Sequence, residues 1–304
     1  MDQKRIIDEF KELVSIEVHS RDERAIADVL KEKLTALGLT VTEDKAGEVL
    51  GGNTGNLYAQ LPGSTDGEPV LFSAHMDRVG NHGHIVPLVK EEEGKIVSDG
   101  TSILAGDDIG GVAAILAMLR EVKEKQIPHG PIEVAFSVCE ETGVEGSRQY
   151  DFSKFRSKSA FVYDASGKAG TIVLAAPSKG RVTIRVHGVT AHAGNEPEKG
   201  LNALKVAADL IMQLPDGRLS PVSTANFSII EAGSATNVVC DLVTITGEQR
   251  SRDAKEYQQI SADIQAAADR ISEKYHTKIE VELHTLYHAF KLEETARPCV
   301  LAKE

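Results

Sequence analysis

At four places in this sequence, a residue of a type that can bind metal follows a predicted core strand or lies in the loop after one. They are His75 after the apolar run 70–74, Asp107 in the loop before a helix that begins near 109, Glu141 after the run 132–138, and Asp164 after the run 160–163. Sites in open α/β sheets form outside the carboxyl ends of the strands. We therefore expect these four side chains to converge at one edge of a sheet, and this expectation constrains the fold most strongly.

Strand and helix patterns alternate through the first part of the chain. The interval 109–123 places apolar residues at i, i+3, i+4 and i+7, and it predicts a helix between two strands. Such alternation predicts an α/β fold, with a mixed and mostly parallel sheet and helices on both faces. At the N-terminus we predict a helix over 3–16 and a second helix, which a capping box at 20–23 opens and Gly38 ends.

The order of the predicted elements changes after Pro177. A strand, a helix, two strands, a long amphipathic helix and a last strand follow one another between 181 and 283. This β-α-β-β-α-β order is the ferredoxin-like arrangement. We therefore predict an inserted α+β domain over 178–288, with 1–177 and 289–304 forming the first domain.

Composition excludes several function classes. The chain has 304 residues, and its 41% hydrophobic and 26% charged content is typical of a soluble globular protein with two domains. A net charge of −12 argues against a nucleic-acid partner, because phosphate binding needs clustered Lys and Arg. The sequence has no signal peptide and no apolar run of about 18 residues, so we expect no membrane partner. Its three cysteines fit a reducing cytoplasm, where we expect the protein to reside.

The four candidate ligands suit a pair of divalent cations. One imidazole and several carboxylates can bind zinc, with manganese or cobalt as alternatives. Two divalent ions carry four positive charges; Asp107, Glu141 and Asp164 supply three negative charges, and a bridging hydroxide would supply the fourth. Taken alone, Asp107 could simply cap the following helix. The four residues in this order at strand ends favour a metal centre instead.

Two neighbouring carboxylates have further predicted roles. Asp77 lies two residues after His75, on the same side of an extended segment, and could accept the second ring N–H of that histidine. Glu140 and Glu141 are adjacent and point apart on an extended chain. One of them can therefore bind metal while the other faces the attacking water as a general base.

Four short motifs occur in a fixed order along the chain: SAHMD at 73–77, GDD at 106–108, EETG at 140–143 and YD at 163–164. In this order they resemble the family of two-metal hydrolases that includes peptidase T, aminoacylases and glutamate carboxypeptidases. The resemblance covers essentially the whole chain, and LAGDDIGG and GEQRSRD are most similar to peptidase T-like tripeptidases. It implies a phosphorylase/hydrolase-like catalytic domain with an inserted lid or dimerisation domain, through which a homodimer could form.

The resemblance also implies roles for the residues that match the family's motifs in the first domain. His75 and Asp164 would bind one metal ion and Glu141 the other. Asp107 would bridge the two ions. Glu140 would act as the general base for attack by water.

Further residues match positions around the metal and the substrate. Asp77 matches the partner that orients the metal-binding histidine. In the inserted domain, His192 matches a histidine that polarises the substrate carbonyl, and Asn237 and Arg250 match residues that contact the substrate. The arginine would suit a peptide carboxylate through two hydrogen bonds. The histidines at 82 and 84 match no family ligand and are interpreted as loop residues.

The sequence departs from the family pattern at its end. Family members continue well past Glu304 with an Asp-Ala-Asn motif and a final metal-binding histidine, so the resemblance implies a C-terminal truncation that removes one ligand of the second metal. The first interpretation is an aminopeptidase that hydrolyses tripeptides. The alternatives are a carboxypeptidase or N-acyl amino acid deacylase of the same family, or an impaired homologue that only dimerises or binds.

Overall fold

The computed structural model describes residues 2–80 and 83–303. Clustering of contacts divides the chain into two compact units, which are described separately. Unit 1 comprises Met1–Thr171 and Thr295–Glu304, and unit 2 comprises Ile172–Glu294. Of the two loop histidines considered above, His82 lies outside the described residues, and His84 lies in an exposed bend.

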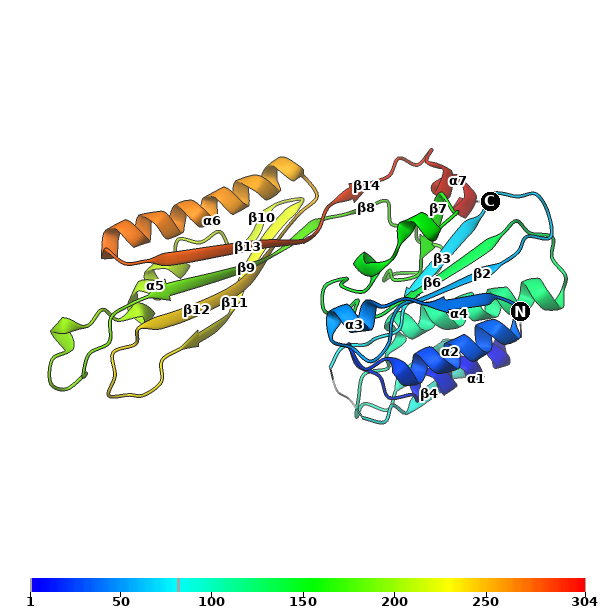
Figure 1. The fold of residues 1–304 in the computed structure, drawn as a ribbon, viewed down its shortest axis with the longest axis horizontal. Coiled ribbons are helices and arrows are strands. Elements are labelled where there is room, and N and C mark those ends of the chain that lie inside the picture. The colour runs from blue at the N-terminus through cyan, green and yellow to red at the C-terminus, as the bar shows by residue number, and fades with distance from the viewer. Residues whose placement is uncertain (1, 81–82, 304) are drawn as a thin grey trace. The chain divides into compact units, whose positions relative to one another are not determined.

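A five-stranded mixed sheet forms the centre of unit 1 (Figure 1). Its strands, in spatial order, are β1 (Thr40–Glu43), β2 (Leu57–Leu61), β6 (Ile132–Ser137), β3 (Val70–His75) and β7 (Ser159–Val162). β3 pairs in parallel with both β6 and β7, whereas β2 is antiparallel to β6 and to β1. The carboxyl ends of β3, β6 and β7 therefore lie at one edge of the sheet, as the sequence predicted.

Three long helices cover this sheet and complete its core. In Figure 1, α1 (Gln3–Val14), α2 (Arg24–Ala36) and α4 (Gly106–Glu124) lie together below the strands. α4 packs against β3, α1 packs against α4, and α2 packs against β1. Unit 1 also contains α3 (Ala46–Leu50), α7 (Arg297–Lys303) and the hairpin of β4 (Pro87–Lys90) and β5 (Lys95–Ser98). Phe136, Leu30 and Leu116 are fully buried between these layers, so burial of apolar surface holds sheet and helices together.

The start of α2 differs from the sequence-based prediction. Glu23 occupies the N-cap position without a side-chain capping hydrogen bond, and Ser20 donates its hydroxyl to Asp77 instead. The backbone N–H of Arg24 donates to Asn53 Oδ1 at 3.0 Å, so a distant loop supplies the cap. The predicted capping box at 20–23 is therefore wrong. The helix begins only at Arg24, beyond the reach of a cap at Ser20, and the hydroxyl of Ser20 forms a charge-assisted hydrogen bond to the Asp77 carboxylate.

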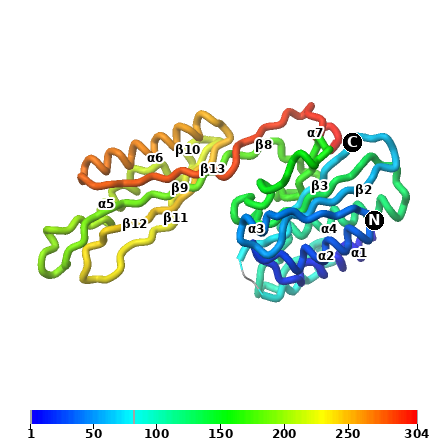
Figure 2. The backbone as a smooth tube through the Cα atoms, viewed as in Figure 1, coloured from blue at the N-terminus to red at the C-terminus, as the bar shows by residue number. Residues whose placement is uncertain are grey.

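Unit 2 has a second sheet, and the path of its strands and two helices can be followed in Figure 2. It also has its own hydrophobic core. Its elements in chain order are β9 (Ser178–His187), α5 (Ala203–Ile211), β10 (Gly217–Ser220), β11 (Ser223–Ala232), β12 (Leu242–Ser251), α6 (Ala254–Tyr275) and β13 (Ile279–Tyr287). The sheet order is β10-β11-β12-β9-β13, and every pairing is antiparallel. The predicted ferredoxin-like arrangement is confirmed, with β10 added as a short edge strand.

The chain enters and leaves this sheet through two short paired strands. β8 (Ala175–Ala176) pairs with β14 (Phe290–Lys291), both within unit 2. Val182, Ile245 and Ile264 are completely buried between the sheet and its two helices. Within the described part of the chain, no helix combines the length and apolar character that crossing a membrane requires.

Candidate metal centre

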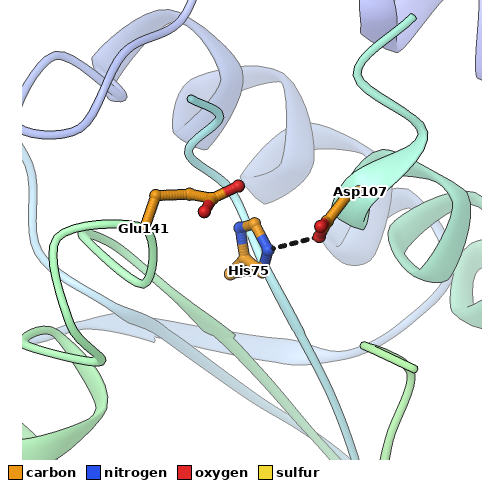
Figure 3. A group of neighbouring side chains, drawn as sticks. All are labelled: His75, Asp107 and Glu141. Atoms are coloured by element: carbon orange, nitrogen blue, oxygen red, sulfur yellow. Dashed lines mark hydrogen bonds and ion pairs between the residues drawn. The ribbon is translucent and has the colours of Figure 1, made fainter. Parts of the chain in front are cut away.

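The strand ends of unit 1 bring the predicted ligands together. His75 is the last residue of β3, Asp107 lies at the start of α4, and Glu141 follows β6. Their ligand atoms lie within 4.8 Å of one another, and Figure 3 shows the imidazole between the two carboxylates. A second group, with ligand atoms equally close, consists of His75, Glu140 and Asp164.

His75 lies at the base of both groups. Its side chain is 2% exposed, whereas the carboxylate of Asp107 is 69% exposed, so the cluster opens to solvent on one side. The imidazole Nε2 lies 3.0 Å from Asp107 Oδ1, the pair joined by a dashed line in Figure 3. Its Nδ1 faces Asp77, 2.9 Å from the backbone oxygen and 3.3 Å from Oδ1. Nε2 is thus directed at the cluster, as a metal ligand requires.

The protonation of His75 reflects the excess of negative charge around it. Burial alone would lower the pKa of the imidazole, but the hydrogen bond and charge of Asp77, with the charges of Asp108 and Glu140, raise it to about 10. This shift favours the imidazolium, whose charge offsets part of the negative charge of these carboxylates. A divalent cation could replace that proton at Nε2, since metal ligation requires the neutral ring.

The carboxylates of the cluster also have raised pKa values. Burial, followed by the charges of neighbouring carboxylates, raises the pKa of Glu140 to about 7. The same causes raise the pKa values of Glu141 and Asp164 above the ordinary range. A cation bound beside such crowded acids would lower their pKa values and favour their ionised forms. The donor set, one imidazole with several carboxylate oxygens, fits zinc, manganese or cobalt.

Asp77 connects the loop after β3 with the loop after β6. It is completely buried, and its Oδ1 accepts a hydrogen bond from the N–H of Glu140 at 2.9 Å. Its Oδ2 accepts from the N–H of Glu141 at 3.2 Å and from the hydroxyl of Ser20 at 2.6 Å. Burial alone would raise its pKa, but the hydrogen bonds from His75, Ser20 and Glu140 hold that pKa below the ordinary value. Asp77 therefore remains an anion that fixes both loops.

Sequence reasoning gave no role to Asp108, which also supports the cluster. This residue is 2% exposed, and its Oδ2 accepts the backbone N–H of His75 at 3.1 Å. Burial raises its pKa to about 8. Gly111 permits this packing, because a Cβ there would approach Asp108 Oδ1 to 2.3 Å and the carbonyl of Tyr163 to 2.7 Å. The doubled aspartate in GDD and the Gly110-Gly111 pair were the sequence signals for this contact.

The three predicted substrate residues all belong to unit 2. The Nδ1 of His192 accepts hydrogen bonds from the N–H groups of Gly194 and Asn195, at 3.1 and 3.2 Å, so the neutral ring carries its proton on Nε2. The carbonyl of Asn237 accepts from Ala193 at 2.9 Å, which places it beside the His192 loop. Both side chains belong to exposed residues.

Arg250 has a carboxylate partner within its own strand. Its Nε donates to Glu248 Oε1 at 2.6 Å, and its Nη2 donates to Oε2 at 3.2 Å. Lys179 lies 3.5 Å from the same carboxylate. The guanidinium of Arg250 is thus held by a two-pronged pairing with a carboxylate of its own strand.

Two parts of the chain match known peptidase families. Residues 177–276 match the family described as the peptidase dimerisation domain, and residues 56–195 match peptidase family M28. The mixed sheet, the acidic cluster at its edge and the inserted domain define a metallopeptidase-type chain of two domains.

Individual relatives identify the family. YqjE of Bacillus subtilis is 36% identical over 304 residues, which cover 100% of this chain and 81% of YqjE. Aminopeptidase PepT from Bacillus cereus superposes with a TM-score of 0.86 at 38% identity, over 98% of this chain and 79% of that one. A tripeptidase from Staphylococcus aureus gives a TM-score of 0.93 at 33% identity, over 100% and 81% of the two chains.

The chain therefore belongs to the peptidase T-like family of metallopeptidases. The match covers 57% of the length of peptidase T from Staphylococcus carnosus and 78% of the length of peptidase T from Shouchella clausii. The predicted fold class and family resemblance are confirmed by these similarities.

Proposed function

We propose that this protein is a metal-dependent aminopeptidase that cleaves short peptides, with tripeptides as its preferred substrates. The observation that carries the proposal is the convergence of one imidazole, that of His75, and four carboxylates at the edge of the unit 1 sheet; the four are Asp107, Glu140, Glu141 and Asp164. The similarity to an aminopeptidase and to a tripeptidase supports the substrate class. A peptidase dimerisation domain over 177–276 supports a homodimer formed through unit 2.

The proposed ligand assignment uses four residues of unit 1. His75 and Asp164 would hold one divalent ion, most simply zinc, Glu141 would hold a second, and Asp107 would lie between them. Bound metal would lower the pKa of a water molecule and polarise the scissile carbonyl.

The protein's own groups supply the proton transfers. Glu140 would take a proton from the attacking water and return it to the leaving amine, which typically contributes 10²–10⁴-fold in rate. Its side chain is 27% exposed and lies 3.9 Å from His75 Nε2, so it is next to the ligand cluster and accessible to water. Asp77 would keep the imidazole oriented by accepting from Nδ1.

Unit 2 would supply the contacts to the substrate. His192, with its proton on Nε2, would donate to the oxyanion that develops on the substrate carbonyl. Asn237 would hold the peptide backbone, and Arg250 would bind the peptide carboxylate.

Hydrolysis of a defined substrate panel tests this proposal. The metal-loaded protein should release the N-terminal residue of a tripeptide faster than it cleaves a C-terminal residue or an N-acetyl amino acid. Glu140→Gln should lose at least 10²-fold in kcat while binding the same amount of metal. Glu48→Gln, on an exposed residue of α3, is the matched control and should retain full activity. Undiminished turnover by Glu140→Gln would contradict the assignment.

A further inference from the structure

The segment 18–23, here called the N-terminal brace, lies between α1 and α2 and contacts both loops that carry candidate ligands. Ser20 donates to Asp77, in the loop after β3. Glu23 accepts from the N–H of Cys139, in the loop after β6. These partners are 57 and 116 residues away in sequence, so the brace joins segments that are otherwise distant.

The contact of Ser20 completes the hydrogen bonding of a buried anion. Asp77 also accepts from the N–H groups of Glu140 and Glu141, at 2.9 and 3.2 Å. The 2.6 Å bond from Ser20 is shorter than either. A hydroxyl that donates to a carboxylate forms a strong, charge-assisted hydrogen bond. Without the Ser20 hydroxyl, the completely buried carboxylate of Asp77 would lose one of its hydrogen-bond donors while still facing His75.

The contact of Glu23 fixes a strained turn. Cys139 has a φ of +50°, in the left-handed region that side chains other than glycine rarely adopt. Glu23 is completely buried, and its Oε1 accepts from the N–H of Cys139 and from that of Arg21, both at 3.0 Å. Such backbone strain persists only where the surroundings over-determine it. The turn leads directly to Glu140 and Glu141, so its geometry determines where those carboxylates point.

The brace is itself held in place at its start. Arg78, the residue after Asp77, is 3% exposed. Its Nε donates to the carbonyl of Val18 at 2.9 Å, and its Nη1 donates to that of Val14 at 3.1 Å. A guanidinium with fixed donors on both carbonyls leaves this part of the chain little freedom to move.

We propose that Ser20 and Glu23 are positioning residues for the metal centre. Ser20 holds the Asp77 carboxylate in the orientation that directs the imidazole ligand. Glu23 holds the turn that presents Glu140 and Glu141. The inference rests on the proposed function, because positioning matters only if these carboxylates serve metal binding and proton transfer.

Zinc affinity of the metal-stripped protein, measured by calorimetry, tests the role of Ser20. Ser20→Ala should bind zinc at least about tenfold more weakly, as expected when a partner of a ligating histidine is disturbed. Ser20→Thr, which keeps the hydroxyl, should restore the affinity. Ser15→Ala is the matched control, since Ser15 donates only to its own helix at Glu12. Ser20→Ala should also lower kcat for a tripeptide while KM stays unchanged. Wild-type zinc affinity and kcat in Ser20→Ala would overturn the role of Ser20.

Hydrogen exchange of the metal-free protein tests the brace independently of metal and activity. Amides 140 and 141 should exchange at least severalfold faster in Ser20→Ala and in Glu23→Ala than in wild type, because their loop is released. Glu23→Gln keeps an acceptor for Cys139 and should exchange like wild type. Unchanged exchange in both alanine variants would overturn the brace. A wild-type protein that binds no zinc and cleaves no peptide would overturn the proposed function, and exchange would still decide whether the brace holds the loop.

Discussion

Asp77 Oδ1 and the backbone N–H of Glu140 are joined by a 2.9 Å hydrogen bond across 63 residues of sequence. The same carboxylate lies 3.3 Å from His75 Nδ1. One buried anion thus sets both the direction of the imidazole and the position of the proposed base. This one carboxylate therefore connects the two loops of the candidate centre, which follow β3 and β6.

This relationship predicts the effect of Asp77→Asn. The amide retains one oxygen, so it can accept from only part of the present donors, and its NH₂ group faces other N–H groups. We expect the zinc affinity of the variant to fall about 10–100-fold. Calorimetric titration of the metal-stripped variant measures this change. Asp28→Asn, on an exposed residue of α2, is the control and should titrate like wild type.

Metal removal should destabilise unit 1. Burial raises the pKa values of Glu140, Glu141 and Asp164, and the charges of neighbouring carboxylates raise them further, so a cation among them should be stabilising. Zinc at about 100 times its Kd should add about 2.7 kcal/mol to the free energy of unfolding. Thermal unfolding before and after chelation measures the change. His75→Ala should show no zinc-dependent rise; a wild-type protein equally indifferent to zinc would contradict the ligand assignment.

Glu43 provides a pH-dependent prediction away from the metal centre. Burial alone would raise its pKa, but hydrogen bonds from Arg24, the N–H of Gly55 and Lys31 hold the pKa well below its ordinary value of 4.5. A depressed folded-state pKa adds stability above the unfolded-state pKa, and that stability is lost as pH falls through the folded-state value. Glu43→Gln should therefore cost about 1–2 kcal/mol at pH 7, after allowance for partial exposure.

Chemical denaturation at several pH values measures this cost. The difference between wild type and Glu43→Gln should be constant between pH 6 and 8 and should shrink as pH falls below about 4. Glu48→Gln alters an exposed side chain and is the control, whose effect on stability at pH 7 should be small. A difference that grows in acid would contradict the assigned direction.

Unit 2 should fold without the rest of the chain. Its core is formed within 172–294, where Val182, Ile245 and Ile264 are completely buried. The isolated segment should unfold cooperatively when followed by circular dichroism. Ile264→Ala should cost about 2–5 kcal/mol, because it removes buried methyl groups and leaves a cavity. Gradual melting of the isolated segment would show that its core is insufficient.

The sequence predicted features that depend on local patterns. Apolar spacing located the helix that became α4, and the strand β3 was expected where Val70–His75 lies. Both predictions held because the spacing of apolar residues indicates which side chains each segment must bury. The ferredoxin-like order of unit 2 was predicted for the same reason.

Features that depend on distant partners were missed. Ser20 looked like a helix cap, yet its hydroxyl bonds to a carboxylate 57 residues away. Asn53, from another loop, caps α2 in its place. Asp108 was given no role despite the doubled aspartate, because its contact is with the backbone of His75, 33 residues away in sequence. Such contacts arise only when the tertiary fold brings the groups together, and local spacing does not encode them.

The location of bound metal tests the central claim most directly. Anomalous diffraction from crystals soaked with zinc would locate each ion independently of any activity. We predict density bounded by His75 Nε2 and by the carboxylates of Asp107, Glu141 and Asp164, at about 2.0–2.2 Å from the ligand atoms. Ions bound elsewhere, or no ion among these side chains at saturating zinc, would contradict the account.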